Sequence, residues 1–403
     1  MKNKMLLIPL MLLLAISLIV IGCQGRKKTT APEVKTLRIG SLLCLTGWWS
    51  VDDVLQQKEL DATAKYINDN GGVTVQGQKY NIELVTEDGQ STMDGVAAAA
   101  RKLVYNDNVQ FIAGPTALWP FGSSPIFAQA DVMDVVSFAG NSPGNMDAST
   151  PNTFLAGAGT LGSMEVAIAI LQKYFPDAKS AVVMRPDDGN TPHIQPAMKT
   201  ALANAGITWA GFVTYSNTTT DFSPTASQLH SIEADAILHV DSNAPMIASI
   251  AKDLRGIGDN RPYITGVICP LQDVIQIAGI DVCHDVSTAG AAMDVPGNPS
   301  QLNAVIKILT DQSGGKTPSL VLMNANALYA LVSVIEAADS LDPATVRAYW
   351  EKAQTVDTLY GPGVVSGTKT FGIADHALTM PSPYQIVQNG QVVSGWVDIP
   401  PIP

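Results

Sequence analysis

The sequence has 403 residues, of which 46% are hydrophobic, and its 36 acidic and 24 basic residues give a formal net charge of −12. A chain of this length exceeds what one hydrophobic core usually serves, so two domains are expected. The acidic balance argues against nucleic-acid binding, which needs a basic surface.

The first 22 residues have the pattern of a secretory signal peptide. Lys2 and Lys4 precede an uncharged, mostly apolar run at residues 5–22, and Cys23 follows directly. A basic flank, an apolar core and a cleavage point are typical of such peptides. The cysteine resembles the lipidated residue of a bacterial lipoprotein, so Cys23 is expected to carry diacylglycerol. The alternative is an uncleaved membrane anchor, since about 18 apolar residues can just span a bilayer.

A polar segment at residues 23–35 separates this run from the rest of the chain. It contains Arg26, Lys27, Lys28 and Pro32, and such a composition buries too little apolar surface to fold. The sequence therefore predicts a flexible tether, with the folded protein held outside the membrane.

Cysteine is sparse, with Cys23, Cys44, Cys269 and Cys283 only. If Cys23 carries lipid, at least one of the other three thiols cannot pair within the chain. Cys269 and Cys283 could form a disulfide in an oxidising compartment, whereas Cys44 lies in an apolar run and is predicted to be a buried small hydrophobe. A zinc site from Cys269, Cys283 and His284 lacks paired ligand spacing, so no metal is expected.

Beyond the tether, strand-like and helix-like segments alternate. The strand-like runs lie at residues 36–43, 80–87, 110–113, 135–139, 180–184, 208–215, 236–239 and 263–267. Amphipathic helical stretches lie between them, for example at residues 54–70, 93–106, 192–205, 244–254 and 324–338. This alternation predicts an α/β fold with mostly parallel sheets and helices on both faces. Sites in such sheets lie at the carboxyl ends of the strands.

Four short motifs follow one another across the first of these segments. Residues 45–47 (LTG) end the first strand, and residues 67–72 (INDNGG) end the next helix, where the glycines supply the stop. Asp88 ends the second strand, and residues 112–115 (IAGP) end the third. In this order and spacing, the motifs resemble the type I periplasmic binding proteins, in particular the branched-chain amino acid receptors of ABC transporters.

The resemblance covers nearly all of the chain beyond the tether. Residues 136–141 (VSFAGN) are similar to a family strand that ends in a ligand loop, and residues 178–188 (AKSAVVMRPDD) are similar to the strand that opens the second lobe. Near the end, residues 384–393 (YQIVQNGQVV) contain Asn389-Gly390, a pair that favours a tight hairpin turn.

The resemblance implies two doubly wound, Rossmann-like lobes that are joined by a hinge of three crossovers and close around a ligand. The implied boundaries are residues 36–154 with 296–357 for the first lobe, 159–287 with 364–403 for the second, and 155–157, 288–292 and 359–363 for the hinge.

One motif could suggest a dinucleotide site, because residues 157–162 read G-x-G-x-x-G. The segment lies at the implied lobe boundary. A dinucleotide site would also need an acidic residue at the end of the following strand, and Asp187 comes too late in the sequence for that position, so we predict a hinge that runs into the start of a helix. The sequence has no P-loop or H-E-x-x-H motif. His239, on an apolar strand, is predicted to be a satisfied core residue. Neither an enzyme nor a bound cofactor is expected.

The resemblance implies three ligand loops in the first lobe, each after a strand. Two adjacent tryptophans in the first loop would expose apolar surface, so one is predicted to wall a pocket and the other to pack beneath it. In the other two, free backbone N–H groups and hydroxyls can hold a carboxylate. The candidate ligand-binding residues are Thr46, Trp48 and Trp49; Thr116, Ala117, Leu118 and Trp119; and Ala139, Gly140, Asn141 and Ser142.

The second lobe departs from the family pattern. The acidic residue that helps relatives to hold an α-ammonium group is replaced by residues 267–269 (VIC). Asp241 or Asp188 could take that role, because a desolvated ammonium needs a carboxylate. The candidates in this lobe are Asp188, Asn190, Asp241, Ser242 and Cys269. The ligand is expected to be an amino acid, a carboxylate, an amide or an aromatic acid.

These features predict a lipid-anchored receptor of the cell envelope, in the periplasm or on the outer surface, that delivers a small molecule to the permease and ATPase subunits of an ABC importer. An alternative is a ligand-sensing ectodomain of the same fold that reports to a signalling partner. A further alternative is an enzyme of doubly wound fold, for which no catalytic constellation is visible.

Overall fold

The structure is a computed structural model that describes residues 33–115, 119–137, 146–157, 159–187, 191–216, 218–290 and 293–402. The chain divides into a short unit, Met1–Val34, and a compact unit, Lys35–Pro403. The predicted signal peptide, Cys23 and most of the predicted tether lie outside the described residues. No helix in the described ranges is long and apolar enough to cross a membrane.

One lobe of the compact unit is built on a nine-stranded sheet. Its strands are β1 (Lys35–Leu43), β2 (Val73–Val75), β3 (Gln78–Asp88), β4 (Phe111–Ala113), β5 (Met133–Val136), β6 (Thr153–Leu155), β12 (Thr355–Thr358), β13 (Gly361–Ser366) and β14 (Ala377–Thr379). Their order is β12-β13-β14-β6-β5-β4-β1-β3-β2. The central strands are parallel, and antiparallel strands lie toward the two edges.

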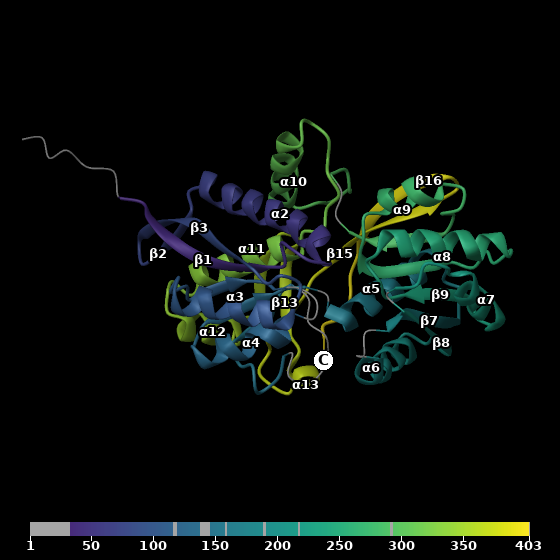
Figure 1. The fold of residues 1–403 in the computed structure, drawn as a ribbon, viewed down its shortest axis with the longest axis horizontal. Helices are drawn as coiled ribbons and strands as arrows, with labels where there is room; N and C mark the ends of the chain where they lie inside the picture. The colour runs from purple at the N-terminus through teal and green to yellow at the C-terminus, as the bar shows by residue number, and fades with distance from the viewer. Residues whose placement is uncertain are drawn as a thin grey trace, which may run out of the picture. The chain divides into compact units, whose positions relative to one another are not determined.

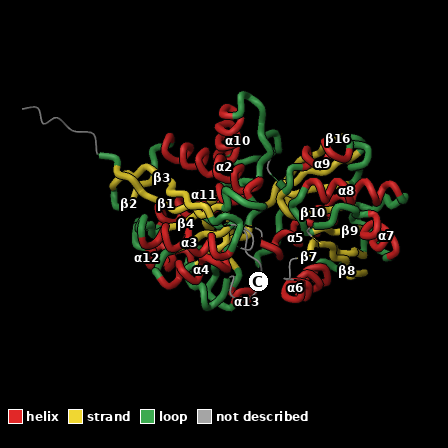
Figure 2. The backbone as a smooth tube through the Cα atoms, viewed as in Figure 1, coloured by secondary structure: helices red, strands yellow, loops and turns green. Residues whose placement is uncertain are grey.

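Helices cover both faces of this sheet (Figures 1 and 2). One face packs against α2 (Ser50–Asp69), α10 (Ser300–Gln312), α11 (Met323–Ala337) and α12 (Pro343–Trp350). The other packs against α3 (Met93–Tyr105) and α4 (Pro120–Gln129). Strand β1 contributes Ile39 to the first face and Leu42 to the second. A strand buried on both faces needs apolar residues on both, which explains why the buried residues 39–43 are apolar apart from Ser41, whereas Lys35, Thr36 and Arg38 lie in the exposed first part of the strand.

The other lobe is built on a seven-stranded sheet. Its strands are β7 (Ser180–Asp187), β8 (Thr208–Ser216), β9 (Ala236–His239), β10 (Tyr263–Ile268), β11 (Val286–Ala289), β15 (Ser382–Gln388) and β16 (Gln391–Val397). Their order is β16-β15-β11-β10-β9-β7-β8, parallel from β8 to β11 and antiparallel at β15 and β16. Two separate apolar clusters cover its faces, one with α5 (Gly159–Tyr174) and α6 (Thr191–Asn204), the other with α7 (Ser223–Ser231), α8 (Ala244–Gly256) and α9 (Leu271–Ala278).

The two α/β lobes confirm the predicted fold class, and the strongest sequence patterns match individual elements. The run predicted at residues 236–239 is β9, and the helix predicted at residues 93–106 is α3 to within one residue. Helix α2 ends before Gly71 and Gly72, both at positive φ, and the Gly72 N–H closes the helix on the carbonyl of Ile67. The hairpin is also confirmed, since Asn389 and Gly390 have φ of 51° and 72° between β15 and β16.

The path of the chain near residue 364 differs from the prediction, which placed residues 364–403 in the second lobe. Strand β13 pairs with β12 and β14, and β14 pairs with β6, so all three belong to the first sheet. The predicted hinge at residues 359–363 is instead the β12–β13 hairpin, in which Thr358 pairs with Gly361. A short helix, α13 (Thr368–Phe371), lies between β13 and β14. The chain passes to the second sheet only after β14, between Thr379 and Ser382.

The G-x-G-x-x-G segment leads from β6 in the first sheet into α5 in the second lobe, so the predicted helix start is confirmed. A Cβ at Gly157 would lie 1.7 Å from the carbonyl oxygen of Ser137. Glycine is therefore required here because two backbones approach closely, which explains this residue without a dinucleotide.

Candidate functional site

The loop between β1 and α2, residues 44–49, is held by two side chains from the neighbouring strand β3 and the turn after it. The Asp88 carboxylate accepts hydrogen bonds from the Leu45 N–H (2.9 Å) and the Thr46 hydroxyl (2.7 Å). Ser91 donates to the Thr46 carbonyl (2.6 Å) and accepts from the Trp49 N–H (3.1 Å). Desolvation opposes ionisation of Asp88, but these hydrogen bonds outweigh it and lower its pKa. The Thr46 hydroxyl therefore holds the loop.

The loop presents two tryptophans in different environments. Trp48 is 64% exposed, whereas Trp49 packs against the apolar cluster under the loop. The Trp48 ring centroid lies 5.2 Å from that of Trp49 and 5.9 Å from that of Trp119, which is only 2% exposed. The adjacent side chains of Trp48 and Trp49 therefore diverge, as predicted. Trp49 and Trp119 support the Trp48 ring from beneath with aromatic contacts.

A buried polar network connects this loop to α11 and to the end of β5. The Asp53 carboxylate accepts from the Cys44 N–H (2.6 Å) and from the Gln56 amide (3.0 Å). Gln56 in turn accepts from the Asn324 N–H (3.2 Å), and Ser137 donates to the Asn324 side chain (2.7 Å). Sequence reasoning missed these residues. The available signal was the three-residue spacing of Asp53 and Gln56, which puts both on one face of α2.

The other predicted loops of the first lobe begin at the edges of the described ranges. Pro115 follows β4, and Ser137 follows β5. Several candidate residues lie outside the described residues: Thr116, Ala117, Leu118, Ala139, Gly140, Asn141, Ser142, Asp188 and Asn190. Their predicted roles stay predictions.

In the second lobe, Asp241 follows β9 and terminates a chain of buried side chains. Tyr215 donates to the Asp241 carboxylate (2.5 Å), and His239 lies between two hydroxyls, 2.6 Å from that of Tyr215 and 2.6 Å from that of Tyr263. Because the single Tyr215 proton goes to Asp241, Nε2 of His239 must donate to Tyr215, and Nδ1 must accept from Tyr263. Burial lowers the pKa of His239 to about 4, so the ring is neutral, as this order requires.

The two remaining second-lobe candidates differ in accessibility. Ser242 is exposed beside Asn243, which caps α8 by accepting from the Met246 N–H (3.1 Å). Cys269 follows β10 and is buried, and burial raises the pKa of its thiol well above the ordinary value. Cys269 and Cys283 are both free thiols, so the possible disulfide is not formed. Cys44 is buried in the apolar cluster, as predicted.

Asp52 in the first turn of α2 lies close enough to Asp241 to be affected by its charge. Desolvation raises the pKa of Asp52, and the negative charge of Asp241 raises it further. No ion pair to lysine or arginine is formed by either carboxylate within the described part of the chain. A further contact joins the lobes, since Ser319 donates to Asp273 of α9 (2.8 Å). The structure thus brings the start of α2 near the end of β9.

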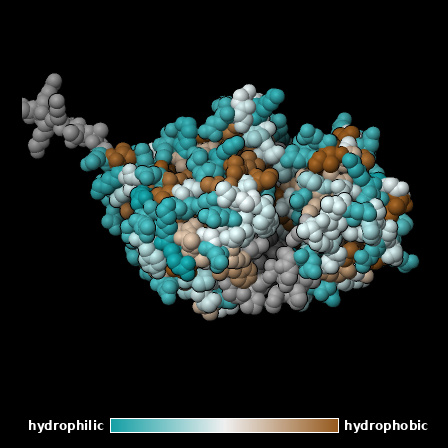
Figure 3. All heavy atoms as spheres, in the orientation of Figure 1, coloured by the Kyte–Doolittle hydropathy of each residue, from teal (hydrophilic) through white to brown (hydrophobic). Residues whose placement is uncertain are grey.

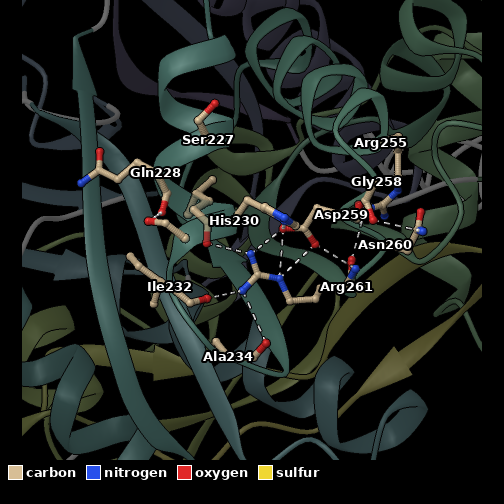
Figure 4. Close-up of polar contacts among 12 residues, drawn as sticks. Ser227, Gln228, His230, Ile232, Ala234, Arg255, Gly258, Asp259, Asn260 and Arg261 are labelled. Atoms are coloured by element: carbon tan, nitrogen blue, oxygen red, sulfur yellow. Dashed lines mark hydrogen bonds and ion pairs between the residues drawn. The ribbon is translucent and has the colours of Figure 1, made fainter.

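A second charged cluster lies in the second lobe, before β10 (Figure 4). Arg261 forms a two-pronged ion pair with Asp259 and donates to the carbonyls of Leu229 and Ile232 at the end of α7. Arg255 donates to the carbonyl of Asp259 (2.7 Å). Since these donors are used by neighbouring backbone and carboxylate groups, the cluster stabilises the junction of α7, α8 and β10.

The described residues contain no group of three His, Cys, Asp or Glu side chains arranged to hold a metal ion. Figure 3 shows hydrophobic residues on the surface over α2, where Val51 and Val54 are exposed beside the tryptophan loop. What the geometry offers is an aromatic surface in one lobe and a hydrogen-bonded carboxylate in the other, a combination suited to binding.

Comparisons with known proteins agree with this geometry. A family model described as periplasmic binding protein matches residues 36–390. A leucine binding protein from Thermotoga maritima has 19% identity and a TM-score of 0.70, over 90% of this chain and 99% of that chain. A branched-chain amino acid transporter substrate binding protein from Streptococcus pneumoniae, in complex with isoleucine, has 18% identity and a TM-score of 0.68, over 90% and 99%. A solute binding protein from R. palustris, in complex with benzoate, has 15% identity and a TM-score of 0.68, over 91% and 97%.

Proposed function

The chain belongs to the periplasmic binding protein family, and from this premise we propose that it is the solute-binding receptor of an ABC importer. In this proposal, the two lobes close around a small organic solute and present it to permease subunits that cytoplasmic ATPases drive. The protein binds and releases its solute unchanged and needs no cofactor.

The proposal includes a lipid anchor at Cys23, at the surface of the cell envelope. It is supported by the basic flank, apolar run and cysteine of the first 23 residues. A Cys23→Ala variant produced in a bacterial host is expected to lose lipid labelling and to leave the membrane fraction, whereas Gln24→Ala keeps both. Equal labelling of the two variants would contradict the anchor.

The observation that carries the proposed binding site is that the charge of Asp241 in one lobe acts on Asp52 in the other. Trp48, which is exposed, precedes Asp52 by four residues, and we place its loop opposite the end of the Asp241 chain. An aromatic ring binds apolar and cationic groups on its face, and the Asp241 carboxylate, which Tyr215 holds in place, can accept hydrogen bonds from a donor.

This arrangement favours one class among the ligands that the sequence leaves open. Asp52 and Asp241 form no ion pair with lysine or arginine in the described ranges, so a cationic group between them would reduce their repulsion. We therefore place amino acids ahead of simple carboxylates, amides and aromatic acids. Structural neighbours of this chain are in complex with isoleucine, benzoate and 3,4-dihydroxybenzoic acid, so both classes belong in the test.

Thermal unfolding with matched solutes tests the proposal. Purified residues 33–403 would be melted with isoleucine, phenylalanine, 3-phenylpropanoate, benzoate and 3,4-dihydroxybenzoate, each at 1 mM. A solute present at about 100 times its Kd stabilises by about 2.7 kcal/mol, which raises the Tm by several degrees. Phenylalanine should act more strongly than 3-phenylpropanoate, which lacks only the ammonium group.

Two controls make the outcome decisive. Asp241→Asn should abolish the preference for phenylalanine over 3-phenylpropanoate, whereas Asp281→Asn, on the same lobe and outside this site, should keep it. If no solute raises the Tm and no small molecule remains bound to the purified protein, the proposed function is wrong. If 3-phenylpropanoate or benzoate acts best, the role of Asp241 is wrong and the receptor function stands.

A further inference from the structure

Residues 398–402 form a connection between the lobes in addition to the three crossovers. Strand β16 ends at Val397, whose side chain is buried in the second-lobe core. Ile402, only 6% exposed, packs in a cluster of the first lobe with Val136, Leu155 and Phe371. Figure 1 accordingly marks this end of the chain near α13, away from β16. The segment is therefore anchored at one end in each lobe.

The segment is stiff because of its composition. It reads Asp398-Ile399-Pro400-Pro401-Ile402, and each proline fixes φ near −65° and lacks an N–H group. Consecutive prolines favour the extended polyproline conformation, which acts as a semi-rigid spacer. Pro400 and Pro401 are exposed, so packing does not require them. Among residues 400–402 the only N–H is that of Ile402, and it donates to the Thr379 hydroxyl (3.1 Å).

The segment runs beside the crossing from β14 to β15. Ser382 pairs with Val397 at the start of the β15–β16 hairpin, and three residues earlier Thr379 accepts from Ile402. Ile399 and Ile402 line one cavity together with Gly157, after β6, and Met380, between β14 and β15. The segment therefore lies against the hinge.

We propose that residues 398–402 act as a strap that limits rotation of the lobes about the hinge. A stiff segment that is anchored in both lobes must detach from one of them before the lobes can separate fully. The strap therefore reduces the population of open forms. The inference rests on the proposed function only in one respect, namely that the closed form binds the solute. Detachment of the strap would then increase the population of open forms and weaken the apparent affinity for the solute.

Two substitutions release the strap in different ways. Ile402→Ser removes the apolar anchor, and Thr379→Val removes the acceptor while keeping the side-chain shape. Val393→Ser is the matched control, because Val393 is an exposed residue of the same hairpin. All are made in residues 33–403 and measured without added solute, by hydrogen exchange and by small-angle scattering.

Hydrogen exchange at residues 379–382 and 155–157 is expected to be about tenfold faster or more in both strap variants than in Val393→Ser, since local opening controls exchange. Scattering should show a larger radius of gyration. If Ile402→Ser does not fold, Thr379→Val alone decides. Exchange and scattering equal to those of the control would overturn the strap. A protein that binds no solute but shows these changes would instead contradict the receptor function and keep the strap.

Discussion

At the scale of single residues, Trp48 is the side chain on which solute binding is expected to depend most. The residue is 64% exposed, and its ring is supported by Trp49 and Trp119. Trp48→Ala should weaken binding of the solute with the largest thermal shift by roughly tenfold, because an aromatic contact contributes about 1 kcal/mol beyond its buried area. Titration calorimetry measures this change. Ile257→Ser, at the end of α8 and 43% exposed, is the control, and an equal loss in both variants would count against the role of Trp48.

The chain that ends at Asp241 predicts a dependence of stability on pH. Burial lowers the pKa of His239 from 6.5 to about 4, so the unfolded chain binds more protons than the folded chain between these values. The contribution of His239 to the free energy of unfolding is therefore fully present above about pH 6.5. It decreases as the pH falls toward 4, by about 1.4 kcal/mol per pH unit.

Denaturant unfolding at pH 7.0 and pH 4.5 measures this contribution. His239→Gln removes the titrating group, so the variant should be less stable at pH 7 but should lose about 2 to 3 kcal/mol less on acidification than the unaltered protein. Equal losses in the two proteins would show that His239 is not held neutral in the folded state.

Some of the candidate site could be predicted from single positions and some could not. The divergence of Trp48 and Trp49 follows from their adjacency, and Asp241 follows from its place after a strand. Tyr215, His239 and Tyr263 come from three different strands, so their contact depends on strand order, which local sequence patterns do not reveal. The approach of Asp52 to Asp241 depends on the arrangement of the lobes and was missed for the same reason.

At the scale of elements, the packing of α5 on β10 requires a residue without a side chain at position 266. A Cβ at Gly266 would lie 1.7 Å from the carbonyl oxygen of Ser163 in α5. Gly266→Ala must separate the helix from the strand, which should cost about 3 kcal/mol or more. Gly256→Ala is the control, because no atom lies within 4 Å of the place that its Cβ would take, and it should be neutral or stabilising. Chemical denaturation that finds the two variants equally stable would contradict this packing.

The elements that were predicted well are those whose burial is decided locally. Strand β9 is a short apolar run buried on both faces, and its limits match the sequence pattern. Strands β13 and β14 were placed in the wrong lobe because their own sequences do not specify a sheet. Their place is set by pairing with β12 and β6, and β6 is distant in the sequence.

At the scale of the whole molecule, the order of motifs along the chain was sufficient to predict two α/β lobes. The crossing between β14 and β15 and the segment at residues 398–402 were not predicted, because both depend on contacts between lobes. Ile402 contacts residues of β5, β6 and α13, and no periodic pattern connects it to them. The inter-lobe contacts are also the part of the structure on which the proposed function depends.

The central claim is that one small organic solute binds between Trp48 and Asp241. Native mass spectrometry of residues 33–403, purified from cells without refolding, tests it most directly. We predict a fraction of the protein with one small molecule bound, and loss of that fraction in a Trp48→Ala/Asp241→Asn double variant that remains folded. A bound molecule that persists unchanged in the double variant would contradict this site. If no small molecule copurifies with the protein and no added solute binds to it, the receptor function is contradicted.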